Sequence, residues 1–155
     1  MNMQRNRRSL LTGMGALTVS VVLPGASARA AIFGAEKRPP LKPDNLSSYI
    51  SVNADGSAIG YWGKMDMGQG TDLGVAQMVA EELDLPIEKV TILQGDTGTS
   101  VNQGGASGST GIQMGGTALA SAAAEARFQL VAMAAKHLNI PADQLTVSNG
   151  VVSAK

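Results

Sequence analysis

The 155-residue sequence has no cysteine, one histidine and only five aromatic residues. Without cysteine the chain forms no disulfide, no thiolate-bound zinc or iron–sulfur centre, and no cysteine nucleophile. Aromatic side chains, here 3% of the residues, usually supply much of the buried area of a small domain. We therefore expect a domain so poor in large apolar side chains to complete its core against segments beyond Lys155.

A net charge is also lacking, because 12 Lys and Arg residues balance 12 Asp and Glu residues. Binding to nucleic acid needs a basic footprint, so we expect no nucleic acid partner. The balance hides an asymmetry: residues 1–30 hold four arginines and no acid, whereas residues 31–155 hold 8 bases and 12 acids. The longer part of the chain is therefore mildly acidic.

Residues 1–30 are typical of an export signal peptide. A basic start precedes an apolar run at residues 10–23 and small-residue cleavage sites around Ala28. The run is shorter than the ~20 residues that span a bilayer, which favours removal over anchoring. The pair Arg7-Arg8, followed by a polar and two apolar residues, resembles a twin-arginine signal, with an ordinary secretory signal as the alternative. We expect a periplasmic or exported protein, and the twin-arginine route suggests a cofactor inserted before export.

Residues 31–45 are rich in proline and charge and have no hydrophobic period, which predicts a flexible leader. Residues 46–155 combine short β-prone runs with amphipathic helices. We expect strands at 48–52, 57–62, 90–93, 145–148 and 151–153, and helices at 72–83 and 117–138. The dipeptide Asn149-Gly150 favours a closing hairpin. This order predicts an α+β fold in which short hairpins and a central strand pack against two helices.

Both predicted helices carry an apolar stripe with a 3.6-residue period. The expected N-cap of the first helix is Thr71 or Asp72. Its stripe consists of Leu73, Ala76, Ala80 and Leu83. The stripe of the second helix consists of Leu119, Ala123, Ala126, Leu130 and Met133.

A short glycine-containing segment, the first glycine loop (residues 64–71), precedes the first helix. It contains Gly68-Gln69-Gly70. Glycine on both sides exposes the Gln69 amide, which both donates and accepts hydrogen bonds, just ahead of a helix N-terminus. The alternative interpretation is a tight turn between a strand and a helix.

A longer segment, the second glycine loop (residues 95–116), holds eight glycines and no charge other than Asp96. Glycine lets a backbone approach a ligand closely, and the following helix offers free N–H groups, so an anion or phosphate cradle is one interpretation. A simply mobile loop and a nucleotide-binding module are the alternatives. The segment has neither the lysine of a P-loop nor a GxGxxG directly after a strand.

Four segments in a fixed order carry a family resemblance. They are Met67-Gly68-Gln69-Gly70, the helix sequence VAQMVAEELDLP, the strand sequence VTILQGDT and the loop sequence GASGSTGIQMGG. Together with the export signal, they resemble the molybdopterin-binding large subunit of the xanthine dehydrogenase and aldehyde oxidase family. The exported branch similar to isoquinoline 1-oxidoreductase β subunits places such a segment first. The resemblance implies that this α+β unit is part of a larger molybdopterin-binding domain.

The resemblance implies a molybdenum–pterin cofactor. Gly68, Gln69 and Gly70 would lie against its molybdenum end, with the Gln69 amide hydrogen-bonded to an oxygen on the metal. Gly108, Ser109 and Thr110 would contact the pterin or its phosphate through backbone N–H and hydroxyl groups. In this family the sulfurs of the pterin hold the metal, so we expect no metal-ligating and no catalytic side chain in this chain.

An activity is implied in the same way. Enzymes of the family oxidise an aldehyde or an N-heteroaromatic carbon with a water-derived oxygen, and pass electrons to an iron–sulfur small subunit. A cytochrome is a further candidate electron acceptor. Family subunits continue well beyond this segment, so we expect an N-terminal fragment or truncated form that is inactive without the remaining part of the large subunit. The alternative is an exported binding or interaction domain that keeps the fold without catalysis.

One residue departs from the family pattern. Gly111 stands where relatives often carry a serine, so the resemblance implies one hydroxyl contact fewer to the cofactor.

Overall fold

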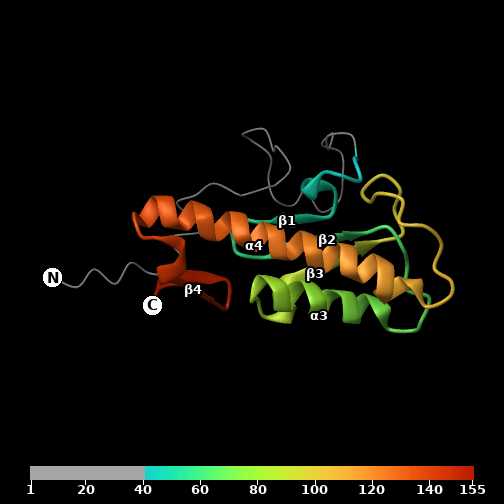
Figure 1. Ribbon diagram of the computed structural model, residues 1–155. Helices are drawn as coiled ribbons and strands as arrows, with labels where there is room; N and C mark the ends of the chain where they lie inside the picture. The colour runs from blue at the N-terminus through green and yellow to red at the C-terminus, as the bar shows by residue number, and fades with distance from the viewer. Residues whose placement is uncertain (1–40) are drawn as a thin grey trace.

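The computed structural model describes residues 41–155. The predicted export signal, and the leader as far as residue 40, lie outside the described residues and remain predictions. Within the last residues of the leader, the Pro43 carbonyl accepts a hydrogen bond from the Tyr49 hydroxyl (2.9 Å). The order of elements then follows the expected strand, helix and hairpin sequence (Figure 1).

A three-stranded sheet forms the centre of the molecule. It consists of β1 (Ile50–Val52), β2 (Ala58–Trp62) and β3 (Val90–Gln94), in the order β1-β2-β3. The strands β1 and β2 form the expected antiparallel hairpin, and β3 lies parallel to β2 at the edge of the sheet. In this register Trp62 is paired with Gln94, so β2 and β3 end side by side.

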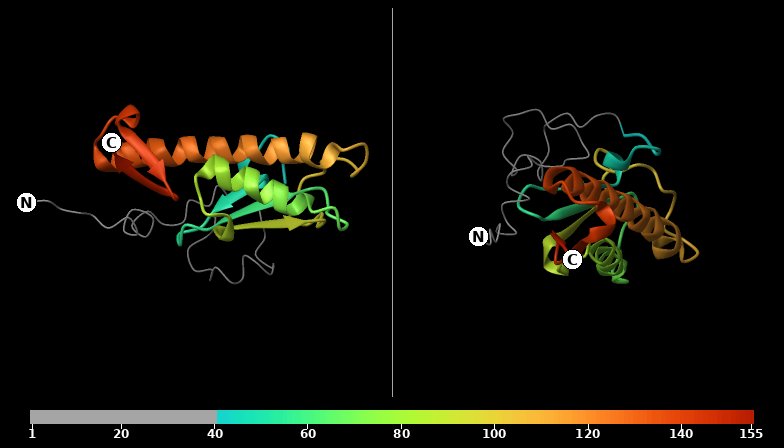
Figure 2. Two further views of the ribbon diagram at one scale, coloured as in Figure 1. Left: turned by 90° about the horizontal axis from the view of Figure 1, so that it is seen from below. Right: turned by 60° about the vertical axis from the view of Figure 1, so that its left-hand side comes forward.

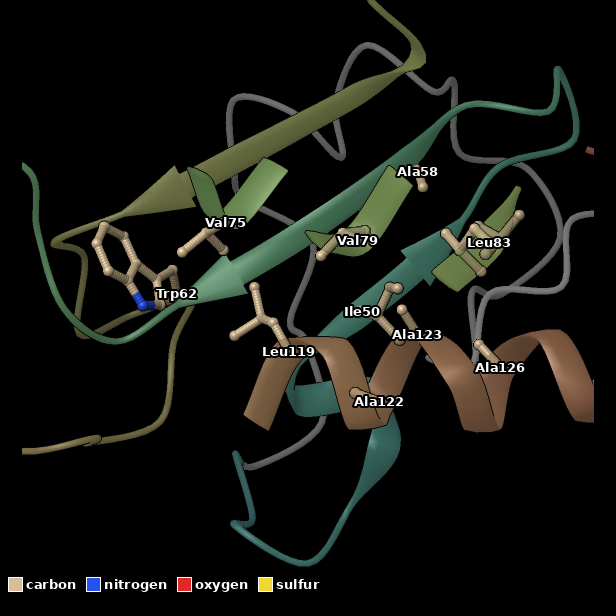
Figure 3. Packing of buried hydrophobic residues seen from close by; sticks show 11 residues of the cluster. Ile50, Ala58, Trp62, Val75, Val79, Leu83, Leu119, Ala122, Ala123 and Ala126 are labelled. Carbon is tan, nitrogen blue, oxygen red and sulfur yellow. The ribbon is translucent and has the colours of Figure 1, made fainter. Parts of the chain in front are cut away.

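Two helices, α3 (Thr71–Leu83) and α4 (Thr117–Leu138), cover one face of this sheet and pack against each other (Figure 2). A parallel pair of strands needs a long crossover connection, and α3 supplies it between β2 and β3. The buried cluster lies between the helices and the sheet (Figure 3). Its members are Ile50, Val52, Ala58, Trp62, Val75, Val79, Leu83, Leu119, Ala122, Ala123 and Ala126.

The predicted stripe of α4 is confirmed in its first half, since Leu119, Ala123 and Ala126 are fully buried. The stripe predicted for α3 is wrong at one end. Leu73 is 57% exposed, whereas Val75 and Val79 are fully buried. Val75 and Val79 face the sheet and α4. Leu73, in the first turn of α3, lies at the margin of this buried face.

The chain closes with the predicted hairpin of β4 (Leu145–Ser148) and β5 (Val151–Ala154). Asn149 and Gly150 both have positive φ, as the two central residues of a type I′ turn require. The hairpin lies at the opposite end of the molecule from the two glycine loops (Figure 2). Within the described part of the chain, no helix combines the length and hydrophobicity needed to cross a membrane.

Candidate functional site

The two glycine loops lie together at one end of the molecule (Figure 1). The first follows β2 and the second follows β3, and parallel strands deliver their carboxyl ends to the same edge of a sheet. Two hydrogen bonds join the first loop to the end of β3 and to the start of the second loop. The Asp66 N–H donates to Gln94 Oε1 (2.7 Å), and the Gly95 N–H donates to the Lys64 carbonyl (3.1 Å). This edge is where open sheets with parallel strands bind ligands.

The first glycine loop is organised by Asp66. Its carboxylate accepts hydrogen bonds from the Gly68 N–H (2.7 Å), the Thr71 hydroxyl (2.9 Å), the Asp72 N–H (3.4 Å) and the Thr71 N–H. The expected cap, Thr71 or Asp72, is therefore wrong. The N-cap position belongs to Gly70, which has a φ of +74° and no side chain, and Asp66 reaches back over the free N–H groups instead.

The charge of Asp66 is favoured by these contacts. The hydrogen bond from the Gly68 N–H lowers the pKa of the Asp66 carboxyl below its ordinary value, and the contacts with Thr71 and Asp72 add to this against a smaller opposing effect of desolvation. A carboxylate here also complements the positive end of the α3 dipole. The N-terminus of α3 is thus already neutralised by the chain itself.

Gln69 lies on the exposed rim of this loop. Its Oε1 accepts from the Met67 N–H (2.8 Å), and its Nε2 donates to the Thr71 hydroxyl (3.2 Å) and, at 3.5 Å, to the Met65 carbonyl. The flanking Gly68 and Gly70 have positive φ, and a Cβ atom at either would meet nothing within 4 Å. The prediction that glycine exposes the Gln69 amide agrees with this geometry, although the amide is folded back onto its own loop.

The second glycine loop is tied to the first by Lys64, which lies two residues after β2 and is only 4% exposed. Its Nζ donates to the Gly105 carbonyl (2.8 Å), to Thr110 Oγ1 (3.2 Å) and, at 3.5 Å, to the Gly104 carbonyl. Sequence reasoning missed this residue. The available signal was a lone lysine directly after the apolar strand sequence AIGYWG.

The predicted residues Gly108, Ser109 and Thr110 form the turn that leads into the helices. Gly108 and Ser109 have φ values of +56° and +60°, and Gly108 faces open space. The Thr110 hydroxyl donates to the Ser107 carbonyl (2.7 Å), so it supports the loop rather than projecting from it. The predicted residues therefore lie on two neighbouring loops, with exposed backbone at Gly68, Gly70 and Gly108.

A π-helix, Gly111–Gly116, joins this turn to α4, a form that recurs at functional sites. Beneath it lies Trp62, at the end of β2, with its ring nitrogen drawn in blue in Figure 3. Among the described residues, three buried polar atoms have no hydrogen-bond partner, and all belong to the end of β2 or the second glycine loop. They are Trp62 Nε1, Ser100 Oγ and Gln103 Nε2.

The comparisons with known proteins agree with one another. The model of a family described as the molybdopterin cofactor-binding domain matches residues 13–155. A nicotinate dehydrogenase subunit of Pseudomonas putida is 38% identical over 116 residues, which cover 75% of this chain and 10% of that protein. The β subunit of isoquinoline 1-oxidoreductase from Brevundimonas diminuta is 33% identical over 95% of this chain and 20% of its own length.

Solved structures show the same relationship. The carbon monoxide dehydrogenase of Oligotropha carboxidovorans superimposes with a TM-score of 0.62 at 28% identity, covering 68% of this chain and 13% of that chain. Quinoline 2-oxidoreductase of Pseudomonas putida 86 gives a TM-score of 0.58 at 25% identity, covering 64% of this chain and 12% of that chain. The sequence relatives and the fold thus define one class, the cofactor-binding parts of large oxidoreductase subunits.

Within that class, the chain belongs to the molybdopterin cofactor-binding domain family, and its cofactor is a molybdenum–pterin. It spans about a tenth to a fifth of the length of the two bacterial relatives above. The residues at the loop end fit the organic part of such a cofactor. They offer exposed glycine backbone, neutral amide and hydroxyl groups, and buried donors without partners. In residues 41–155, no group of three or more His, Cys, Asp or Glu could hold a metal ion.

Proposed function

We propose that this chain forms part of the molybdenum–pterin site of a molybdenum hydroxylase large subunit. The observation that carries the proposal is the convergence of the two glycine loops at the common end of β2 and β3. Two of the relatives are named for nicotinate and isoquinoline, which are both N-heteroaromatic compounds. An N-heteroaromatic carbon is accordingly the proposed point of oxidation, with an aldehyde as the other member of the class.

In this proposal the first glycine loop faces the molybdenum end of the cofactor. The Gln69 amide exchanges its hydrogen bonds within the loop for one to the cofactor, and Gly68 and Gly70 leave room for close approach. Backbone groups of Gly108 and Ser109 contact the pterin or its phosphate. Thr110 holds the shape of the second loop through its bond to Ser107.

When bound, the cofactor supplies the two-electron oxidation, while the residues of this chain bind and orient it. The proposed partners are the remaining part of the large subunit, an iron–sulfur small subunit and a cytochrome acceptor. Relatives named as subunits and large chains support an assembly of several chains. Export through a twin-arginine signal remains part of the proposal, since it would deliver the cofactor already inserted.

The test is the cofactor content of the full chain, purified with any subunits that accompany it. We expect molybdenum and pterin in the complex, and about tenfold faster loss of molybdenum on dialysis in the Gln69→Ala variant, which lacks one polar contact. Gln129→Ala is the matched control, because Gln129 is an exposed glutamine on α4 bonded only to Glu125 (2.9 Å).

Two outcomes would contradict the proposal. Equal molybdenum retention in both variants would remove the role of Gln69. A wild-type chain that carries neither molybdenum nor pterin would instead favour the exported binding domain that keeps the fold without catalysis.

A further inference from the structure

Lys64 is a buried cation that links two segments far apart in the sequence. Its side chain is 4% exposed, and the residues that its Nζ contacts, Gly104, Gly105 and Thr110, lie 40 to 46 positions further along the chain. All three acceptors are uncharged oxygens. A buried ammonium is costly unless its protons are satisfied, so these bonds hold both the lysine and the loop in place.

The loop segment that Lys64 contacts has little packing of its own. A Cβ atom at Gly104, Gly105 or Gly108 would meet nothing within 4 Å. Apart from Lys64, the side chains that bond to the backbone there belong to the loop itself: Asn102 Oδ1 accepts from the Gly104 N–H (2.8 Å), and the Thr110 hydroxyl donates to the Gly105 carbonyl (3.1 Å). Apart from the Lys64 contacts, the chain just before this segment is joined to Gly63, directly after β2, by the hydrogen bond from the Gly63 N–H to Gln103 Oε1 (2.8 Å) and by the close approach of Gly63 to the Val101 carbonyl. The position of this backbone therefore depends on polar contacts with the two residues that follow Trp62.

The aliphatic part of Lys64 lies beneath the π-helix. A Cβ atom at Gly115 would lie 3.0 Å from Lys64 Cδ and 3.2 Å from Cε. The side chain thus passes under Gly115 before its ammonium reaches the carbonyls of the loop. Packing along this path fixes the direction from which the ammonium approaches the loop carbonyls. A lysine on the surface would not be constrained in this way.

We propose that Lys64 is a positioning residue that clamps residues 104–110 in the shape needed to receive the cofactor. The proposal rests on the proposed function, because the clamped segment contains the backbone assigned to the pterin. Lys64 acts through the loop and does not itself touch substrate. Its removal should loosen residues 104–110 and leave the sheet and α4 intact.

The experiment is limited proteolysis by subtilisin, with cleavage sites mapped by mass spectrometry, on the full chain and its accompanying subunits. Lys64→Met removes the ammonium while keeping an unbranched apolar side chain. We expect cleavage within 102–110 to become about tenfold faster, since a charge-assisted hydrogen-bond cluster is lost and cleavage follows the population of the open loop. Cleavage within α4 should be unchanged.

Lys155→Met is the matched control. Lys155 Nζ also donates to a backbone carbonyl, that of Asp143 (2.6 Å), but it does so at the closing hairpin. The control should leave cleavage at 102–110 at the wild-type rate. Lys64→Arg, which keeps a charged donor, should restore at least part of the protection.

Unchanged cleavage at 102–110 in Lys64→Met would overturn the clamp. If the Lys64→Met variant unfolds throughout, the test is made on the wild-type chain by measuring the rates at which its lysines are acetylated. Acetylation of Lys64 should be at least about tenfold slower than that of Lys155. Equal rates would overturn the proposal. Cofactor content separates the two proposals. If Lys64→Met loosens the loop in a protein that carries no molybdenum, the role of Lys64 as a clamp stands and the proposed function is rejected.

Discussion

At the scale of single residues, three polar side chains near the end of β2 shape the loops. Asp66 closes the N-terminus of α3, Lys64 holds the second glycine loop, and Gln103 accepts the Gly63 N–H. Each bonds mainly to backbone groups. These side chains fix the shape of the loops, so the backbone of the glycines can remain exposed.

The Asp66 contacts predict a pH dependence. A carboxyl whose pKa is lowered in the folded state adds stability above its ordinary pKa, and this stability is lost as the pH falls through the lowered value. For Asp66, whose ordinary value is 3.8, that window lies below pH 4. Asp66→Asn should lower the melting temperature at pH 7 and flatten its decline below pH 4, as thermal melts from about pH 7 to about pH 2.5 would show.

Asp143→Asn, at the far end of the chain, is the control and should reproduce the wild-type curve. Part of the decline should persist in Asp66→Asn, because the Ser57 hydroxyl and N–H likewise lower the pKa of Asp55 in the turn between β1 and β2. An Asp66→Asn curve parallel to wild type at every pH would contradict the role of its charge.

The close packing around Gly115 allows a prediction about stability. A Cβ atom there would lie 2.5 Å from Trp62 Nε1, so Gly115→Ala forces a buried ring to move. Alanine in a helix normally stabilises by up to ~1 kcal/mol over glycine, but overpacking costs about 1–3 kcal/mol, so we expect net destabilisation. Urea unfolding followed by fluorescence measures the difference.

Gly105→Ala is the matched control, since a Cβ atom there meets nothing within 4 Å. It should change the free energy of unfolding by no more than about 0.5 kcal/mol. A Gly115→Ala protein as stable as Gly105→Ala would show that the π-helix moves away from Trp62 without penalty.

At the scale of elements, close packing depends on small residues. Four of the eleven residues in the buried cluster are alanines, three of them on α4, which lets this helix approach the sheet. Gly60 in β2 serves the same purpose, because a Cβ atom there would lie 2.9 Å from Leu119 Cδ2. Leu119 fills the space above Gly60 and is fully buried.

Two leucine-to-alanine changes test this packing. Leu119→Ala should reduce the free energy of unfolding by about 2–5 kcal/mol, the range for buried leucines in a core that cannot collapse. Leu73→Ala, at a position 57% exposed on α3, should change it by no more than about 0.5 kcal/mol. Urea titrations compare the two variants. Equal losses in the free energy of unfolding would contradict the difference in burial between Leu119 and Leu73.

At the scale of the whole molecule, the two glycine loops lie at one end and the closing hairpin lies at the other (Figure 2). Four of the exposed large apolar side chains lie in or beside the two glycine loops: Met65, Met67, Leu73 and Met114. Exposed apolar groups gathered near a polar site are typical of a surface that contacts another segment. The expectation that further segments complete this domain stays a prediction, and it is consistent with the two relatives above, of which the chain covers only 10% and 20%.

The order of four sequence motifs indicated the family. The sequence by itself also determined the α+β class, the element order and both glycine loops, because strand periods, helix stripes and an Asn-Gly turn are local signals. Tertiary structure alone decided how these parts meet. It made Asp66 the cap of α3, turned Val75 inward instead of Leu73, and joined Lys64 to a loop 40 residues away. For the Lys64 link the physical reason is the parallel register of β2 and β3, which brings together groups that no local pattern can pair.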